Sequence, residues 1–175
     1  MPNWVHNEII CKPDLVSKIV NSDGEVDFNI LIPSPETKEQ CIAEFGEKFI
    51  DNGDAHVTHE DGKDWFNWYA WNIVYWGTKW NACDGYVDTV GKYSRVSFDT
   101  AWSSPSNWIE KLASLGKPFI HYWEEEQGFG EINGYNGNIE LSEGWDMPEY
   151  DEDEEDFEVE DHYVSEKDMK EFFGD

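Results

Sequence analysis

The sequence predicts one α+β domain of βαββαβ type that carries an insertion and ends in an acidic tail. Three observations support this prediction. Apolar residues alternate with period two in several short stretches, and they repeat at helical spacing in others. The density of acidic residues rises sharply near residue 143. The chain has 175 residues, enough for one domain with its own core, and an aromatic content of 16% adds large side chains to fill it.

The first elements alternate between strand and helix. Residues 3–11 are predicted to form a strand, because apolar side chains fall on every second position. A short helix follows, with Pro13 in its first turn, where a proline is favoured. Residues 26–32 alternate again and predict a second strand, which stops before residues 33–35 because two prolines there prevent further pairing.

An insertion at about residues 36–82 separates the two halves of the domain. Residues 40–49 carry an apolar stripe and predict one helix. The tryptophan-rich stretch 64–75 has nearly helical spacing and predicts a second helix, followed by a loop at Gly77.

The second half begins with the clearest strand, at residues 93–102. A helix is expected directly after it. Ser104 is suited to the N-cap, Pro105 to the first helical position and Gly116 to the end of the helix.

A C-terminal hairpin is predicted to complete the sheet. Residues 118–125 alternate as a strand, and Gln127-Gly128 forms a turn into an extra strand at 129–135. The glycines at 134 and 137 mark the expected end of the sheet.

The folded domain is therefore predicted to span residues 1–142 and the acidic tail residues 143–175. The tail holds 16 acids and two lysines, whereas the first 142 residues hold the remaining 23 acids and 10 bases. Residues 151–156 are an unbroken run of acids, which is expected to be extended when free. Ser165 can cap a short helix at 165–173. The tail either orders on a partner or serves solubility.

The formal net charge of −27 limits the possible partners. Such a chain is repelled by nucleic acids and by anionic membranes, so neither is an expected direct partner. A protein with a basic surface or groove is favoured. The alternative is that the charge serves solubility alone.

Neither a metal site nor a cofactor is predicted. The three cysteines, Cys11, Cys41 and Cys83, are too far apart for a CxxC motif, and reduced thiols in a cytoplasmic protein are expected. No secretion signal and no apolar run of membrane-spanning length is present in the sequence. His56 and His59 are spaced like two metal ligands, but no matching pair occurs elsewhere.

No nucleophile or phosphate-loop motif is found, and the protein is predicted not to be an enzyme. Enzymatic activity would require a surface cleft in which titratable groups converge.

Four stretches of the sequence resemble a known family. They are Asn3-Trp4-Val5-His6-Asn7, the segment from Asp27-Phe28 to Pro33-Ser34-Pro35, Trp76-Gly77-Thr78-Lys79-Trp80-Asn81, and Phe98-Asp99-Thr100-Ala101-Trp102-Ser103-Ser104-Pro105. A weaker fifth is the acidic turn 124–130. Together they resemble the YubB-type ferredoxin-like domain family of phages and conjugative plasmids over residues 2–138. This resemblance implies a ferredoxin-like βαββαβ sandwich and a mobile-element origin, but no particular activity.

The tryptophan motif supplies a candidate ligand site. Its predicted residues are Trp76, Lys79, Trp80 and Trp102. Lys79 is one of only 12 bases, and Asp84 or Asp99 can pair with it. The alternative is that the tryptophans are core or lid residues that stabilise the fold.

Two functional hypotheses follow. The first is a non-enzymatic phage or mobile-element protein that inhibits a host protein whose natural ligand is nucleic acid, as anti-restriction and anti-CRISPR proteins do. Carboxylates would then occupy a groove built for phosphates. The predicted partner-binding residues are Asp151, Glu152, Asp153, Glu154, Glu155, Asp156 and Glu158. The second is a regulatory module that binds a small ligand or peptide at the tryptophan cluster, for which deletion of residues 146–175 would be harmless.

Overall fold

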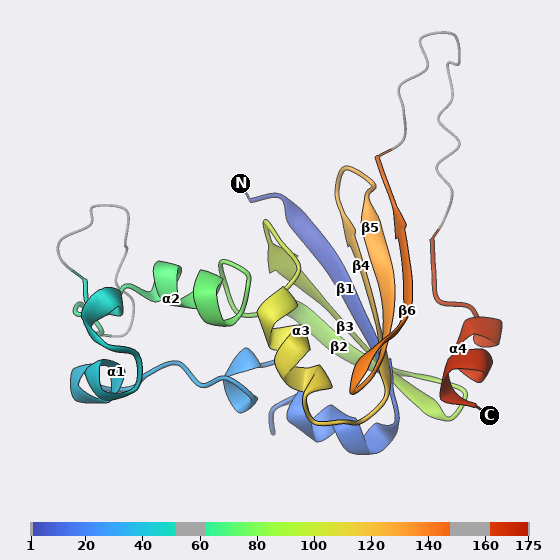
Figure 1. Cartoon of the computed structure of the whole chain (residues 1–175), viewed down its shortest axis with the longest axis horizontal. Helices are drawn as coiled ribbons and strands as arrows, with labels where there is room; N and C mark the ends of the chain where they lie inside the picture. The colour runs from blue at the N-terminus through green and yellow to red at the C-terminus, as the bar shows by residue number, and fades with distance from the viewer. Residues whose placement is uncertain (1, 52–61, 148–161, 175) are drawn as a thin grey trace, which may run out of the picture.

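A six-stranded antiparallel sheet forms the centre of the protein in a computed structural model, which describes residues 2–51, 62–147 and 162–174 (Figure 1). The strands lie in the order β2-β3-β1-β4-β5-β6. Their bounds are β1 Trp4–Cys11, β2 Cys83–Val90, β3 Tyr93–Ala101, β4 Phe119–Glu125, β5 Gly130–Asn136 and β6 Asn138–Trp145. Because β1 lies between β3 and β4, the first four strands have the split arrangement of a βαββαβ domain.

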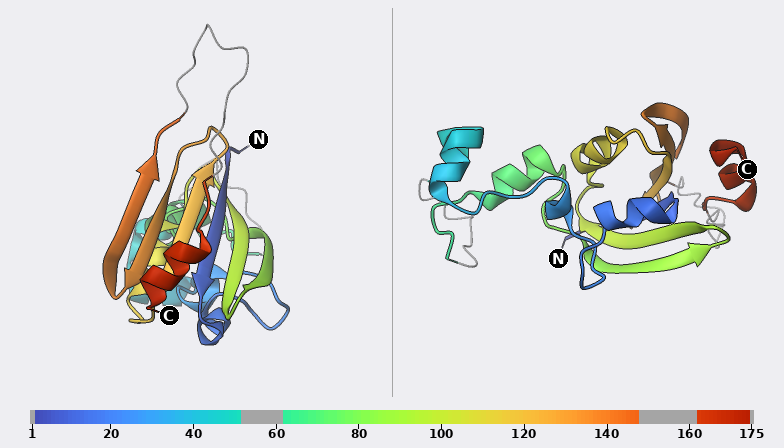
Figure 2. Two further views of the ribbon diagram at one scale, coloured as in Figure 1. Left: turned by 90° about the vertical axis from the view of Figure 1, so that its right-hand side faces the viewer. Right: turned by 90° about the horizontal axis from the view of Figure 1, so that it is seen from below.

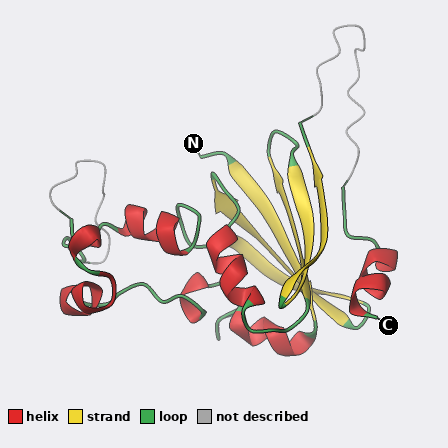
Figure 3. Cartoon of the chain, in the orientation of Figure 1, coloured by secondary structure: helices red, strands yellow, loops and turns green. Residues whose placement is uncertain are grey.

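Helices cover both faces of this sheet (Figures 2 and 3). The α-helices are α1 Lys38–Phe45, α2 Trp68–Tyr75, α3 Ser106–Ala113 and α4 Glu166–Phe173, and the short 3₁₀ helices are η1 Pro13–Lys18, η2 Phe28–Ile30 and η3 Glu47–Phe49. η1 and α3 lie on one face, and α4 lies on the other. Within the described ranges, no helix is both long and apolar enough to cross a bilayer.

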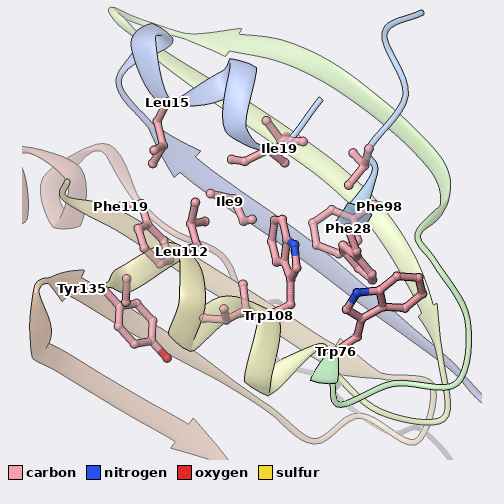
Figure 4. Packing of buried hydrophobic residues seen from close by; sticks show 14 of the residues in the cluster. Ile9, Leu15, Ile19, Phe28, Trp76, Phe98, Trp108, Leu112, Phe119 and Tyr135 are labelled. Atoms are coloured by element: carbon pink, nitrogen blue, oxygen red, sulfur yellow. The ribbon is translucent and has the colours of Figure 1, made fainter. Parts of the chain in front are cut away.

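The main core lies between the sheet and the helices η1 and α3 (Figure 4). Ile9 of β1, Phe98 of β3 and Trp108 of α3 are almost completely buried there. The ring centroids of Phe28 and Trp108 are 4.8 Å apart. Burying a side chain of this size contributes about 2–3 kcal/mol. These three side chains come from the predicted alternation of β1 and β3 and from the predicted apolar stripe of α3.

The inserted segment has an aromatic core of its own that continues into the main one. α2 lies within the predicted stretch 64–75, whereas the predicted helix at 40–49 is α1, which begins at Lys38 and ends before Gly46, followed by η3. Phe45 packs against Trp71 and Tyr75 of α2, and Phe49 packs against Tyr75. Trp71 and Tyr75 stack at 5.0 Å. The rings of this segment therefore replace the aliphatic side chains that the composition lacks.

The predicted strand at 26–32 is wrong. Val26 makes only an isolated bridge to Val20, and η2 follows. The Asp27 carboxylate accepts a hydrogen bond from the backbone N–H of Asn29, and Phe28 N–H donates to the Asn81 side chain. Because side chains satisfy these backbone donors, this segment does not join a sheet.

The strand that takes its place is β2, which the sequence analysis missed. It lies at the edge of the sheet, and Tyr86 and Val87 are exposed. Six of its eight residues are exposed, so it has no continuous buried face and therefore no alternation to detect.

The sheet also continues past its predicted end. Gly137, with φ +79°, forms the turn into β6, so the first three residues of the predicted tail, 143–145, are part of a strand. Gly134 lies inside β5. A glycine suits this position because a Cβ would lie 2.5 Å from the ring of Phe172 of α4. The glycines thus mark a turn and a close contact rather than the end of the sheet.

The end of the predicted tail returns to the sheet as α4. Ser165 caps it as predicted, in a capping box with Asp168. Met169 is buried beneath it, and Phe173 stacks on Tyr93 of β3 at 4.4 Å. The residues that flank the undescribed stretch also meet, since His162 stacks on Trp145 at 4.0 Å.

Truncation of Met169 tests the docking of α4. We expect Met169→Ala to lower the free energy of unfolding by about 2 kcal/mol, because it removes the side chain that α4 buries against the sheet. Met147→Ala is the matched control, since Met147 is 51% exposed. Urea denaturation of both variants measures the difference, and equal stabilities would show that α4 does not dock.

Candidate binding site

A buried side-chain amide joins four segments next to the candidate site. Asn7 is fully buried in β1. Its Nδ2 donates to the carbonyl of Val5 and to Thr100 Oγ1, each at 3.0 Å. Its Oδ1 accepts from Ser104 Oγ at 3.1 Å and from His121 Nε2 at 3.0 Å. β1, β3, β4 and the turn before α3 are therefore fixed relative to one another, and Ser104 serves this network rather than the predicted N-cap of α3.

The two tryptophan motifs are held together by a second set of hydrogen bonds. Thr78 Oγ1 donates to the carbonyl of Ala101 at 2.9 Å, and Ser103 Oγ donates to that of Gly77 at 2.7 Å. Gly77 has φ +84°, and a Cβ there would lie 2.8 Å from Ser106 Oγ. Only glycine fits this approach, so the motif residues first of all build a rigid double loop.

This double loop separates the predicted cluster into two parts. Trp76 lies in the core, and its Nε1 donates to the carbonyl of Ile32 at 2.9 Å. Lys79, Trp80 and Trp102 lie together at the surface. Lys79 Nζ is 4.6 Å from the ring centroid of Trp80 and 4.2 Å from that of Trp102. A cation between two indoles is a favourable contact.

The two predicted partners of Lys79 have other roles. Asp99 accepts a hydrogen bond from His6 Nδ1 at 3.0 Å, and Asp84 adopts φ +50° at the start of β2. The hydrogen bonds with Glu8 and with Asp99 raise the pKa of His6 against the opposing effect of burial. Lys79 is thus held by aromatic rings, and among the described residues no carboxylate pairs with it.

Trp102 is the most unusual residue of this surface. Its backbone has φ +72°, a region that a bulky side chain rarely adopts. The N–H of Trp102 donates to the carbonyl of Asn3 at 2.8 Å, yet its side chain remains 48% exposed. A strained backbone that presents an exposed indole is the kind of outlier that occurs at ligand sites.

A cavity of about 560 Å³ opens beside Trp102, between α3 and the strands β4 and β5. Three carboxylates from three elements line it: Glu110 of α3, Glu125 of β4 and Glu131 of β5. Four aromatic rings also line it: Trp102, Trp123, Phe129 and Tyr135. Among the described residues that line this cavity, none is a lysine or an arginine.

His121 lies in the wall of this cavity and is 2% exposed. Burial lowers its pKa from 6.5 to about 3, so the ring is neutral at physiological pH. Since Nε2 donates to Asn7, the proton of the neutral ring is on Nε2, and Nδ1 is an acceptor. No described residue forms a hydrogen bond with Nδ1.

Titratable groups converge in this cavity, as an enzyme would require. Two of them have shifted pKa values, and both shifts move away from neutrality: burial lowers the pKa of His121 to about 3 and raises that of Tyr135. An acid–base catalyst needs a pKa near the working pH. Neither His121 nor Tyr135 is therefore poised to exchange a proton near neutral pH. In the part of the chain that the structure describes, no group of three potential ligands is placed to hold a metal ion.

Sequence reasoning did not find this cavity, although part of the signal was present. Alternation along β4 places His121, Trp123 and Glu125 on one face. It could not show that α3 leaves part of this face uncovered. The predicted partner-binding acids at 151–156 and 158 lie outside the described residues.

Comparison with known proteins identifies a family. Residues 75–168 match a family model described as a ferredoxin-like domain in Api92-like protein, and this match covers more than half of the chain. It includes the Trp76–Asn81 motif and every pocket residue discussed above. No curated protein and no solved structure gives a significant match.

The charge state of His121 provides a test of the site. In nitrogen-15 NMR spectra at about pH 5, we expect a neutral His121 ring with its proton on Nε2, whereas His6 should be cationic because its pKa is raised. His121 is protonated near pH 6.5 in the unfolded chain but only near pH 3 in the folded protein. The contribution of the neutral His121 to the free energy of unfolding is therefore complete above pH 6.5 and is lost as the pH falls towards 3. The slope reaches about 1.4 kcal/mol per pH unit. A cationic His121 at pH 5 would contradict the buried network.

Proposed function

The chain belongs to the family of ferredoxin-like domains in Api92-like proteins, and we propose that within this family it is a non-enzymatic binding protein for a partner with a basic surface or groove. The observation that supports this proposal most directly is the cavity beside Trp102. Its walls bring together three carboxylates and four aromatic rings without a lysine or arginine among the described lining residues. A partner's cationic side chains fit such a surface.

The charge of the whole chain acts in the same direction. A formal net charge of −27 attracts a basic partner over a long range and repels nucleic acid. Association is therefore expected to be fast and strongly salt-dependent, because screening shortens this range to about 10 Å at 0.1 M salt.

A host protein that handles nucleic acid is the partner class that this charge suits best. Carboxylates pair with the same arginine and lysine groups that bind phosphates. The acids at 151–156 and 158 would occupy that groove, and the resemblance to phage and plasmid proteins fits an inhibitor of a defence factor. Trp145, at the end of the edge strand β6, stacks on His162.

A second function is supported by the exposed, strained Trp102. In this alternative the chain is a regulatory module that binds a small ligand or a peptide at the surface of Lys79, Trp80 and Trp102. Since Lys79 already lies between the two indoles, a cationic ligand would have to displace it. Tryptophan fluorescence would report that displacement.

Charge neutralisation separates the two functions. Deletion of residues 146–175 would also remove α4, which packs on the sheet, so substitution in place is the cleaner test. We expect changing residues 151–154 to Asn and Gln to weaken binding of the captured partner by about tenfold and to reduce its salt dependence. Neutralising four exposed acids of the α1 region, Glu36, Glu39, Glu44 and Glu47, is the matched control. Unchanged binding in the first variant would support the second function.

Affinity purification of the tagged full chain from its host tests the partner class. At low salt we expect recovery of a nucleic-acid-handling protein that duplex DNA elutes in competition. Recovery of only proteins that DNA does not elute would contradict the proposal of nucleic-acid mimicry.

A further inference from the structure

Two residues that line the cavity beside Trp102, Glu125 and His121, each have an acceptor atom that no described donor reaches. Glu125 Oε2 is buried, and no hydrogen-bond donor reaches it from the described residues. His121 Nδ1 belongs to a side chain that is 98% buried and is an acceptor because Nε2 bonds to Asn7. For the buried Glu125 Oε2 the missing donor costs about 1–3 kcal/mol, so a ligand whose N–H groups reach this atom gains that energy on binding.

Several lining side chains that could donate already donate within the protein. Ser103 donates to Gly77, Ser104 donates to Asn7, and Asn133 Nδ2 donates to Glu131 at 3.0 Å. The three surrounding carboxylates and the unused acceptor of Glu125 favour a ligand that supplies donors and carries a positive charge.

The aromatic walls favour a flat cation over a compact one. Trp102, Trp123 and Phe129 line the same cavity, and the last two meet edge to face with ring centroids 5.9 Å apart. A guanidinium group stacks on such rings and also offers five donors in one plane, whereas an ammonium group is a compact, strongly hydrated charge. The volume of about 560 Å³ lies within the range of about 300–1,000 Å³ that ligand sites occupy.

We propose that this cavity binds the guanidinium group of an arginine side chain of the basic partner. Glu125 and His121 Nδ1 accept hydrogen bonds from the guanidinium at the buried end, while Glu110 and Glu131 supply charge from the two sides. Trp102 covers the group at the rim, where Lys79 and the hydrogen bond to Asn3 restrain the indole. The proposal rests on the function proposed above and specifies the side chain that the partner contributes.

The test compares the affinities of two peptides of equal charge, hepta-arginine and hepta-lysine, for the full chain. Both carry the same fluorescent label, and fluorescence anisotropy measures their binding. We expect hepta-arginine to bind about tenfold more tightly, because the guanidinium satisfies acceptors that an ammonium reaches only in part. Glu125→Gln should remove most of this preference, because it replaces the buried acceptor by an amide that donates. Glu39→Gln on α1 is the matched control and should leave the preference unchanged.

A site-resolved measurement keeps the proposal independent of variant folding. Titration of the unaltered protein with N-acetyl-arginine methylamide should shift the NMR signals of His121 and of the Trp123 indole, and the lysine analogue should shift them much less. Equal affinities for the two peptides, or signals that move only outside the cavity, would overturn the proposal while leaving a basic partner in place. Failure of both peptides to bind at low salt would overturn the proposed function as well.

Discussion

The buried amide of Asn7 is the constraint on which the sheet and the candidate site depend. An amide in the middle of a core is costly unless its donors and acceptor are all used, and here it makes four hydrogen bonds. These bonds extend from β1 to Thr100 of β3, to His121 of β4 and to Ser104 before α3. An apolar side chain at this position would fill the space but would make none of these hydrogen bonds, and Ser104 and His121 would each lose a partner.

The same bonds determine the chemistry of the cavity. Because Asn7 Oδ1 accepts a hydrogen bond from His121 Nε2, the proton of the neutral imidazole is on Nε2, and the lone pair is on Nδ1. Burial then keeps the ring neutral, with a pKa of about 3. A buried network of this kind adds specificity to the fold, and here it also leaves an acceptor in the wall of the cavity. The stabilising network and the candidate site therefore share one residue.

Three of the tryptophans are buried, whereas Trp102 is exposed. Trp71, Trp76 and Trp108 are buried in the main core and its extension into the insertion, and they form the aromatic core that compensates for few aliphatic residues. Trp102 is exposed because the double loop behind it is held by the hydrogen bonds of Thr78 and Ser103. The two tryptophan motifs thus build a platform, and Trp102, their non-glycine residue with a positive φ, is the one that faces outward. The hydrogen bonds that hold the double loop therefore lie behind the exposed indole of Trp102.

The local sequence determined the strands at 4–11, 93–101 and 119–125, the helix at 106–113 and the cap at Ser165, because each has a buried face or a terminus that leaves its own pattern. Only the tertiary structure decided that 28–30 is a helical turn. Its backbone donors are taken by Asp27 and by Asn81, and Asn81 lies far away in the chain. Tertiary packing alone also revealed β2, which has no buried face to produce a pattern, and the return of α4 to the second face of the sheet. The cavity has the same origin. Its carboxylates come from three elements, and periodicity reports which face of an element is buried but not which other element covers it.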